Sequence, residues 1–120
     1  METVGQKVTY ALLEAHSLPP GDEIRLVVLA EKGGSFHTQS QPCVVMRDEQ
    51  LRCPELYVGD PDSKNEKYTM MAVQANDEVA REFMKYLLDA EARGYPGIGG
   101  LPDDARILHD VKVQRHSSVD

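Results

Sequence analysis

Histidine and cysteine are the residue types in this chain best suited to metal chemistry. Imidazole nitrogen and thiolate sulfur both bind zinc, and zinc sites commonly contain one pair of ligands two to five residues apart. The histidines and cysteines of this chain contain no pair at that spacing, so we predict no metal site. We expect a histidine on an apolar strand face, such as His109, to be satisfied by a hydrogen bond. The full set is His16, His37, Cys43, Cys53, His109 and His116.

The two cysteines flank a predicted turn at residues 48–50. If the hairpin closes symmetrically about Asp48, Cys43 and Cys53 face each other, whereas a shift of one residue in register separates them. A cytosolic protein normally keeps its cysteines reduced. We therefore predict two free, buried thiols.

Nucleophilic catalysis has no local signature in the sequence. The chain contains no Gly-x-Ser-x-Gly, and its serines lie in predicted turns, a weak strand or the tail. Cys43 with His37 could supply a nucleophile and a base, but a buried structural thiol is the commoner role for such a cysteine. We predict no catalytic residue.

The acidic segment 60–66 partly resembles a calcium-binding loop in composition. Lys64 stands where an oxygen ligand is needed, and Asn65 replaces the glycine that the sharp turn requires. This pattern indicates a solvated turn. Its carboxylates Asp60 and Asp62 are candidate surface contacts for a partner.

A second loop, 94–100, is rich in glycine. Loops that cradle phosphate lead into a helix, whereas this one leaves a predicted helix and is followed by acidic residues. We therefore predict no bound cofactor. Because the loop is long and carries apolar side chains, Tyr95, Ile98 and Leu101 are the candidate binding residues.

The clearest structural element in the sequence is a helix over residues 76–93. Asn76 or Asp77 can cap its first turn, and apolar residues recur at spacings of three and four through Phe83 and Ala90. Gly94 and then Pro96 stop it. One face of this helix must be buried.

Short strands separated by turns account for most of the remaining sequence. Residues 24–30 are apolar on one face and largely apolar on the other, which is typical of a central strand. Pro42 ends the following strand or marks an edge. We predict an α+β fold: a mostly antiparallel β-sandwich or curled sheet that carries one helix. Residues 1–120 form one domain, with 1–5 and 116–120 frayed.

Composition excludes several classes of function. The chain has 41% hydrophobic and 28% charged residues, which is ordinary for a globular domain. Its formal charge of −7 repels phosphate backbones, so we predict no nucleic-acid partner. It has no apolar run of about 18 residues and no N-terminal signal pattern, so we predict no membrane partner and a cytoplasmic location.

The layout of the second half provides a resemblance. Pro54 to Gly59, the strand that begins at Lys67, the helix ending in Tyr86-Leu87-Leu88, and the segment from Gly94 to Arg115 follow one another in order. This layout resembles a small β-sandwich accessory module that occurs beside signalling or effector domains in bacterial multidomain proteins. The resemblance covers roughly residues 54 to 115 and implies an interaction or sensing role without catalytic residues.

Two functional hypotheses follow. The first is a non-catalytic binding or regulatory domain of a bacterial cytoplasmic protein, whose partner is a protein or a neighbouring domain, with an exposed sheet edge able to pair with a second copy. The alternative is a small-molecule-binding domain or cryptic enzyme with a cavity of several hundred Å³ between helix and sheet. Its predicted lining is Tyr57, Tyr68, Tyr86 and His109.

Overall fold

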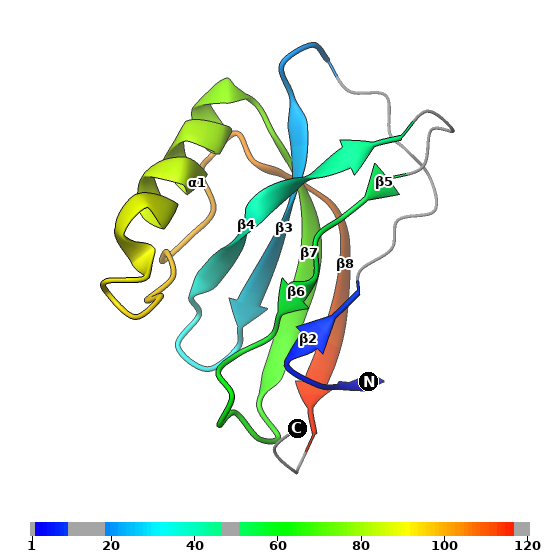
Figure 1. Cartoon of the computed structure of the whole chain (residues 1–120), viewed down its shortest axis with the longest axis vertical. Helices are drawn as coiled ribbons and strands as arrows, with labels where there is room; N and C mark the ends of the chain where they lie inside the picture. Colours follow the sequence, from blue (N-terminus) through cyan, green and yellow to red (C-terminus); the bar gives the residue numbers. More distant parts are fainter. Residues whose placement is uncertain (1, 10–18, 47–50, 117–120) are drawn as a thin grey trace.

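A computed structural model describes residues 2–9, 19–46 and 51–116 of the chain. Within this part, one six-stranded sheet has the order β1-β8-β7-β3-β4-β5, and a second sheet pairs β2 with β6 (Figure 1). The elements are β1 Glu2–Val4, β2 Lys7–Val8, β3 Glu23–Ala30, β4 Phe36–Val45, β5 Leu51–Arg52, β6 Leu56–Tyr57, β7 Lys67–Ala75, α1 Asp77–Ala90 and β8 Arg106–Arg115.

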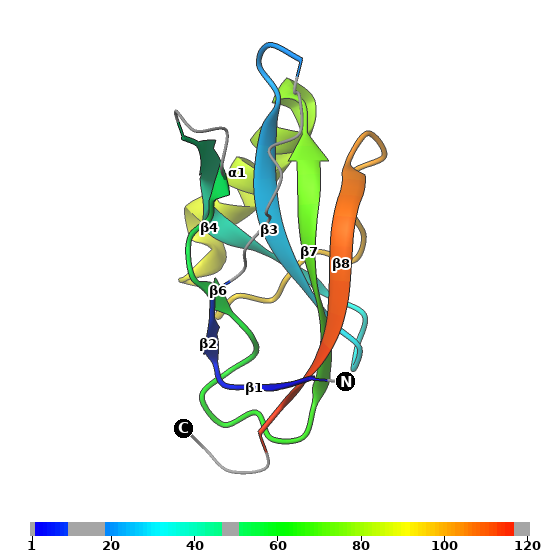
Figure 2. The ribbon, with the colours of Figure 1, turned by 90° about the vertical axis from the view of Figure 1, so that its right-hand side faces the viewer.

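The two faces of the main sheet each bury an apolar cluster. β3 lies between β7 and β4, as its apolar sequence predicts. Its side chains alternate, so that Leu26 and Val28 join a cluster with Leu56 and Val58, while Val27 joins a cluster with Phe83. We call these the concave-face core and the helix-side core. The small sheet covers part of the concave face, on the opposite side of the interior from β7 and β8 (Figure 2).

The strand-rich α+β fold with a curled sheet and one helix is therefore confirmed for the described residues. The main sheet is an open half-barrel. The second sheet consists of two-residue strands, Lys7 and Val8 opposite Tyr57 and Leu56. These strands are too short to form a second full layer.

The helix begins where its capping residue predicts. Asn76 has extended backbone angles, and its side chain accepts a hydrogen bond from the backbone N–H of Val79 at 2.9 Å. The helix ends at Ala90 rather than at the predicted Arg93. Residues 91–94 instead form a turn in which Gly94 adopts a φ of 75° and the N–H of Tyr95 donates to the carbonyl of Ala90 at 2.8 Å. This is the glycine-terminated helix end that the sequence indicates.

Pro42 does not interrupt β4, which runs through it. β4 pairs with β3 along its inner side, but its outer strand neighbour, β5, reaches only Val44 and Val45. Pro42 therefore occupies an edge position, where a missing N–H breaks no ladder on the outer side.

The N-terminal residues form a short strand, so the fraying predicted there is not observed. Glu2–Val4 pair in parallel with Val113–Arg115 at the end of β8, and Val4 is buried. Lys7–Val8 form β2, and residues 10–18 lie outside the described part of the chain, as do residues 117–120.

Cys43 and Cys53 form a disulfide, so the prediction of two free thiols is wrong. The reason is the register of the hairpin. Val44 pairs with Arg52 and Val45 with Leu51, which sets Cys43 directly opposite Cys53. Disulfides are typical of oxidising compartments, and the cytoplasmic prediction is not confirmed.

Candidate functional site

A cavity of about 580 Å³ opens on the concave face of the sheet. Its base comes from three neighbouring strands whose registers align their side chains. Val28 of β3 is paired with His37 of β4, and Ala30 of β3 with Tyr68 of β7, so these four side chains share one face. Buried Gln39, two residues beyond His37, continues the base and accepts the N–H of Tyr57 at 3.0 Å.

The first wall of the cavity is the loop between β6 and β7. Ser63 Oγ accepts the N–H of Asp60 at 3.0 Å, and Tyr68 Oη lies 3.1 Å from the same oxygen. Tyr68 Oη also donates to Glu66 Oε2 at 2.7 Å. Gly59 has a φ of 76°, and a Cβ there would overlap the Tyr68 hydroxyl. Only glycine therefore allows the loop to lie this close to the tyrosine.

The second wall is the end of α1 and the loop after it. Tyr86 and Leu87 project from the last turn of the helix, and Tyr95 follows the helix end. The Tyr86 hydroxyl accepts the N–H of Gly97 at 3.0 Å, which ties the loop to the helix. The cavity thus lies where three elements far apart in the sequence meet: the base of the sheet, the loop 59–66 and the helix end.

Two titratable groups in the cavity have shifted pKa values. Burial lowers the pKa of His37 below its usual 6.5, an effect that the charge of Asp60 partly opposes. His37 is therefore neutral at pH 7. Burial raises the pKa of Tyr68 above 10.0, the hydrogen bond with Glu66 acts in the same direction, and the hydrogen bond with Ser63 and the charge of Arg115 oppose it.

Ser35 and His37 form a contact that resembles part of a catalytic pair. Ser35 Oγ lies 2.9 Å from His37 Nε2. A serine nucleophile also needs a group that orients the imidazole and donors that stabilise an oxyanion. Asp60 influences His37 through its charge, but no carboxylate in the described part of the chain hydrogen-bonds to that ring. The pair alone does not make a hydrolase site.

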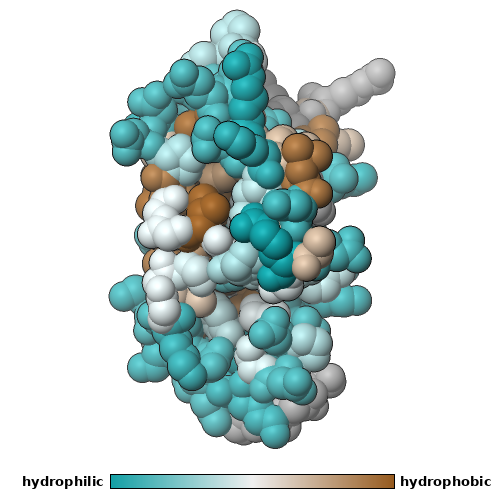
Figure 3. All heavy atoms as spheres, turned by 90° about the vertical axis from the view of Figure 1, so that its left-hand side faces the viewer, coloured by the Kyte–Doolittle hydropathy of each residue, from teal (hydrophilic) through white to brown (hydrophobic). Residues whose placement is uncertain are grey.

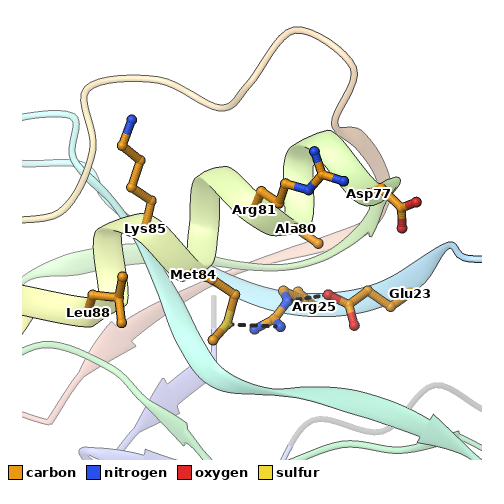
Figure 4. A pocket seen from close by; sticks show the side chains of 8 residues that line it. All are labelled: Glu23, Arg25, Asp77, Ala80, Arg81, Met84, Lys85 and Leu88. Carbon is orange, nitrogen blue, oxygen red and sulfur yellow. Dashed lines mark hydrogen bonds and ion pairs between the residues drawn. The ribbon is translucent and has the colours of Figure 1, made fainter.

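A second, shallower hollow of about 480 Å³ lies between α1 and the start of β3 (Figure 4). Arg25 is buried in its base, where Nε contacts Glu23 Oε1 at 2.7 Å and Nη2 contacts the sulfur of Met84 at 3.4 Å. Arg25 Nη1 is buried and has no hydrogen-bond partner among the described residues. Charges of both signs line the hollow, including Asp77 and Lys85, so it has no clear preference for a ligand of either charge.

The structure separates the residues singled out from the sequence. Asp60 and Tyr95 line the cavity, whereas Asp62 lies on the same loop outside the lining. Ile98 and Leu101 are half-buried against the helix-side core, so they anchor their loop. The predicted lining residues Tyr57, Tyr68 and Tyr86 do meet at the cavity.

His109 does not belong to the cavity. It is exposed and is paired with Ala72 of β7, four residues along the strand from Tyr68. At about 3.3 Å per residue, this places it roughly 13 Å farther along the sheet. His109 lies on the same face of the sheet as Tyr68, but the cavity is at the other end of that face.

Sequence reasoning missed the polar residues on the base of the cavity. His37 and Gln39 are two residues apart on β4, which is the spacing that places side chains on one face. That spacing indicates a shared strand face and could have been read from the sequence. Glu66 gave no local signal, because its place beside Tyr68 depends on the path of the loop.

Comparison with known proteins gives no family for the chain. No protein-family model, no curated protein and no solved structure matches it. Within residues 2–9, 19–46 and 51–116, no group of three or more histidine, cysteine, aspartate or glutamate side chains could hold a metal ion. No helix of the described chain is long and apolar enough to cross a membrane.

Proposed function

We propose that the chain is a non-catalytic binding domain and that the cavity on the concave face is its ligand site. The observation that carries this proposal is the cavity of about 580 Å³ in which aromatic rings and a few polar groups converge. Small-molecule sites commonly enclose about 300–1,000 Å³ and have this composition. Of the two hypotheses drawn from the sequence, the one that requires a cavity therefore has the stronger support.

The absence of a complete catalytic set among the described residues favours binding over reaction. His37 is neutral and contacts Ser35, but the N–H of Gly97, which lies beside this pair, already donates to Tyr86. Without a donor that stabilises the oxyanion, a nucleophile accelerates acyl transfer much less. The pair is better suited to hydrogen-bonding a ligand.

The proposal is tested by a fragment titration followed by backbone amide NMR. A set of neutral, cationic and anionic fragments is added, and we expect at least one to shift amides of β4, residues 57–68 and 86–95 together. Ala30→Leu places a larger side chain in the cavity and is expected to abolish those shifts. Ala92→Leu, on the exposed turn after α1, is the matched control and should leave them unchanged. Fragments that bind nowhere near the cavity would contradict the proposal.

A protein or a neighbouring domain is the second candidate partner. Its support is an apolar pair on α1 that borders the second hollow, Met84 and Leu88, which are 44% and 84% exposed. The face that carries α1 is otherwise mostly hydrophilic, with separate apolar patches (Figure 3). Exposed apolar side chains clustered in this way often mark an interaction surface. Leu88→Ser should then weaken partner binding while leaving cavity ligands unaffected.

The sheet edge at β8 supports pairing with a second copy. β8 pairs with β7 along its length, but β1 covers only Val113–Arg115, so Arg106–Lys112 have no described strand on their outer side. Charged side chains along this segment oppose uncontrolled pairing. Sedimentation over a range of concentrations measures whether a dimer forms, and Val111→Pro should abolish a dimer that uses this edge.

The remaining expectations are proposals of the same kind. We propose an accessory-module role beside other domains of a bacterial protein, with the β2–β6 sheet as the reduced second layer of a sandwich. A cytoplasmic location remains a proposal that requires the Cys43–Cys53 bond to be reduced in the cell. Thiol labelling in cell lysate, with rapid acid quenching, measures its state directly.

A further inference from the structure

We infer that the cavity on the concave face takes an organic cation: an ammonium group carrying apolar or hydroxylated substituents. This inference rests on the proposed function and adds the chemical class of the ligand. Its basis is that carboxylates and tyrosine rings line the cavity, whereas no lysine or arginine of the described residues does.

Among the described residues, the charged side chains that line the cavity are Asp60 and Glu66, both carboxylates, and no lysine or arginine lines it. Glu66 is held by the Tyr68 hydroxyl at 2.7 Å, whereas Asp60 has no side-chain hydrogen bond to another described residue. His37 adds no positive charge at pH 7, because burial lowers its pKa. The formal charge of −7 on the whole chain also favours the approach of a cation.

Four tyrosines line the same cavity: Tyr57, Tyr68, Tyr86 and Tyr95. The face of an aromatic ring attracts cations, and aromatic groups around a cavity are the usual way to bind a quaternary ammonium. Two of these rings already hold side-chain cations. Lys7 Nζ lies 5.9 Å from the centre of the Tyr57 ring, and Arg93 Cζ lies 5.8 Å from that of Tyr86. Lys7 and Arg93 lie outside the lining, so a ligand cation in the cavity competes with them for these two rings, whereas Tyr68 and Tyr95 have no such contact among the described residues.

Four side-chain cations lie near the cavity and oppose a positive ligand, and none of them belongs to the lining: Lys7, Lys32, Arg93 and Arg115. Arg115 is buried behind the lining and directs Nη1 to the carbonyl oxygens of Val58 and Asp60, each at 2.7 Å. Lys32 Nζ lies 4.0 Å from Glu66 Oε1, but its side chain is 87% exposed. An exposed pair of this kind is weak and readily exchanged for a ligand.

The test compares two compounds of nearly the same shape. Choline carries a quaternary ammonium, and 3,3-dimethyl-1-butanol replaces the charged nitrogen with carbon. Both are titrated into the full chain at low salt and followed by amide NMR. We expect choline to shift the amides around the cavity and to bind roughly tenfold more tightly than the alcohol. Raising the salt concentration should weaken choline binding.

Matched variants locate the charge effect. Asp60→Asn should weaken choline binding about three- to tenfold, whereas Asp62→Asn, on the same loop outside the lining, should leave it within about twofold. Tyr57→Leu should weaken binding and Tyr57→Phe should restore it. Thermal unfolding of each variant checks that the fold is retained.

Each outcome bears on a different claim. If the alcohol binds as tightly as choline, or if both aspartate variants behave alike, the cavity has no preference for a cation and the inference is wrong. If choline fails while neutral or anionic fragments shift the cavity amides, the inference is wrong and the proposed function stands. If no compound of any charge shifts those amides, both are overturned.

Discussion

Arg115 Nη1 donates to the carbonyl oxygen of Asp60 at 2.7 Å, although 55 residues separate them in the sequence. The same nitrogen donates to the carbonyl of Val58 at 2.7 Å. Arg115 is the last residue of β8 and is 1% exposed. The end of the final strand therefore holds the start of the loop that forms one wall of the cavity.

Arg115→Met should loosen that wall. The substitution removes a charged donor from two carbonyl oxygens, so we expect the free energy of unfolding to fall by about 1–3 kcal/mol. Urea unfolding measures the loss, and amide hydrogen exchange should rise first at residues 58–63. Arg106→Met, at the exposed opposite end of β8, is the matched control. Equal stability of the two variants would show that Arg115 does not hold the loop.

Loss of the disulfide should destabilise the hairpin of β4 and β5. Cys43 and Cys53 are separated by 10 residues. Closing a loop of that size lowers the conformational entropy of the unfolded chain, which stabilises the fold by roughly 2–3 kcal/mol. We expect that decrease in unfolding free energy for the double variant Cys43→Ser with Cys53→Ser. Wild-type protein treated with dithiothreitol should behave in the same way. Two titratable thiols in protein purified without reductant would contradict the bond.

His37 should make stability depend on pH below neutrality. Because burial lowers its pKa in the folded state, the unfolded chain binds a proton first as the pH falls. The free energy of unfolding is therefore expected to have its full value above about pH 6.5. It should decrease as the pH falls from 6.5 to the lowered pKa. NMR titration of the His37 ring gives that pKa directly.

The control for this pH dependence uses the neighbouring carboxylate. The charge of Asp60 raises the pKa of His37, so Asp60→Asn should move the titration of His37 to still lower pH. His37→Gln should remove the His37 part of the stability loss. An unchanged pH profile in His37→Gln would mean that other groups account for it.

Asn76 should contribute measurably to the start of α1. Its side chain accepts the Val79 N–H at 2.9 Å, so Asn76→Ala leaves that donor without a partner. We expect the free energy of unfolding to fall by about 1 kcal/mol. Asn76→Asp keeps an acceptor at the same place and should stay within a few tenths of the wild type. Chemical denaturation of the three proteins side by side makes the comparison.

The sequence by itself determined the helix and the central strand. Asn76 and Gly94 limit α1 through contacts within one or two turns, and the apolar pattern of β3 reflects burial on both faces. Such signals are local, because capping and side-chain alternation involve neighbours along the chain.

Only the tertiary structure decided the disulfide and the cavity. Whether Cys43 faces Cys53 depends on strand register, and one residue of slip would have separated them. His37, Asp60 and Tyr86 come together because the curl of the sheet, the path of a loop and the end of a helix converge, and His109 is excluded because it pairs farther along β7. These placements depend on packing between distant segments, which no short stretch of sequence encodes.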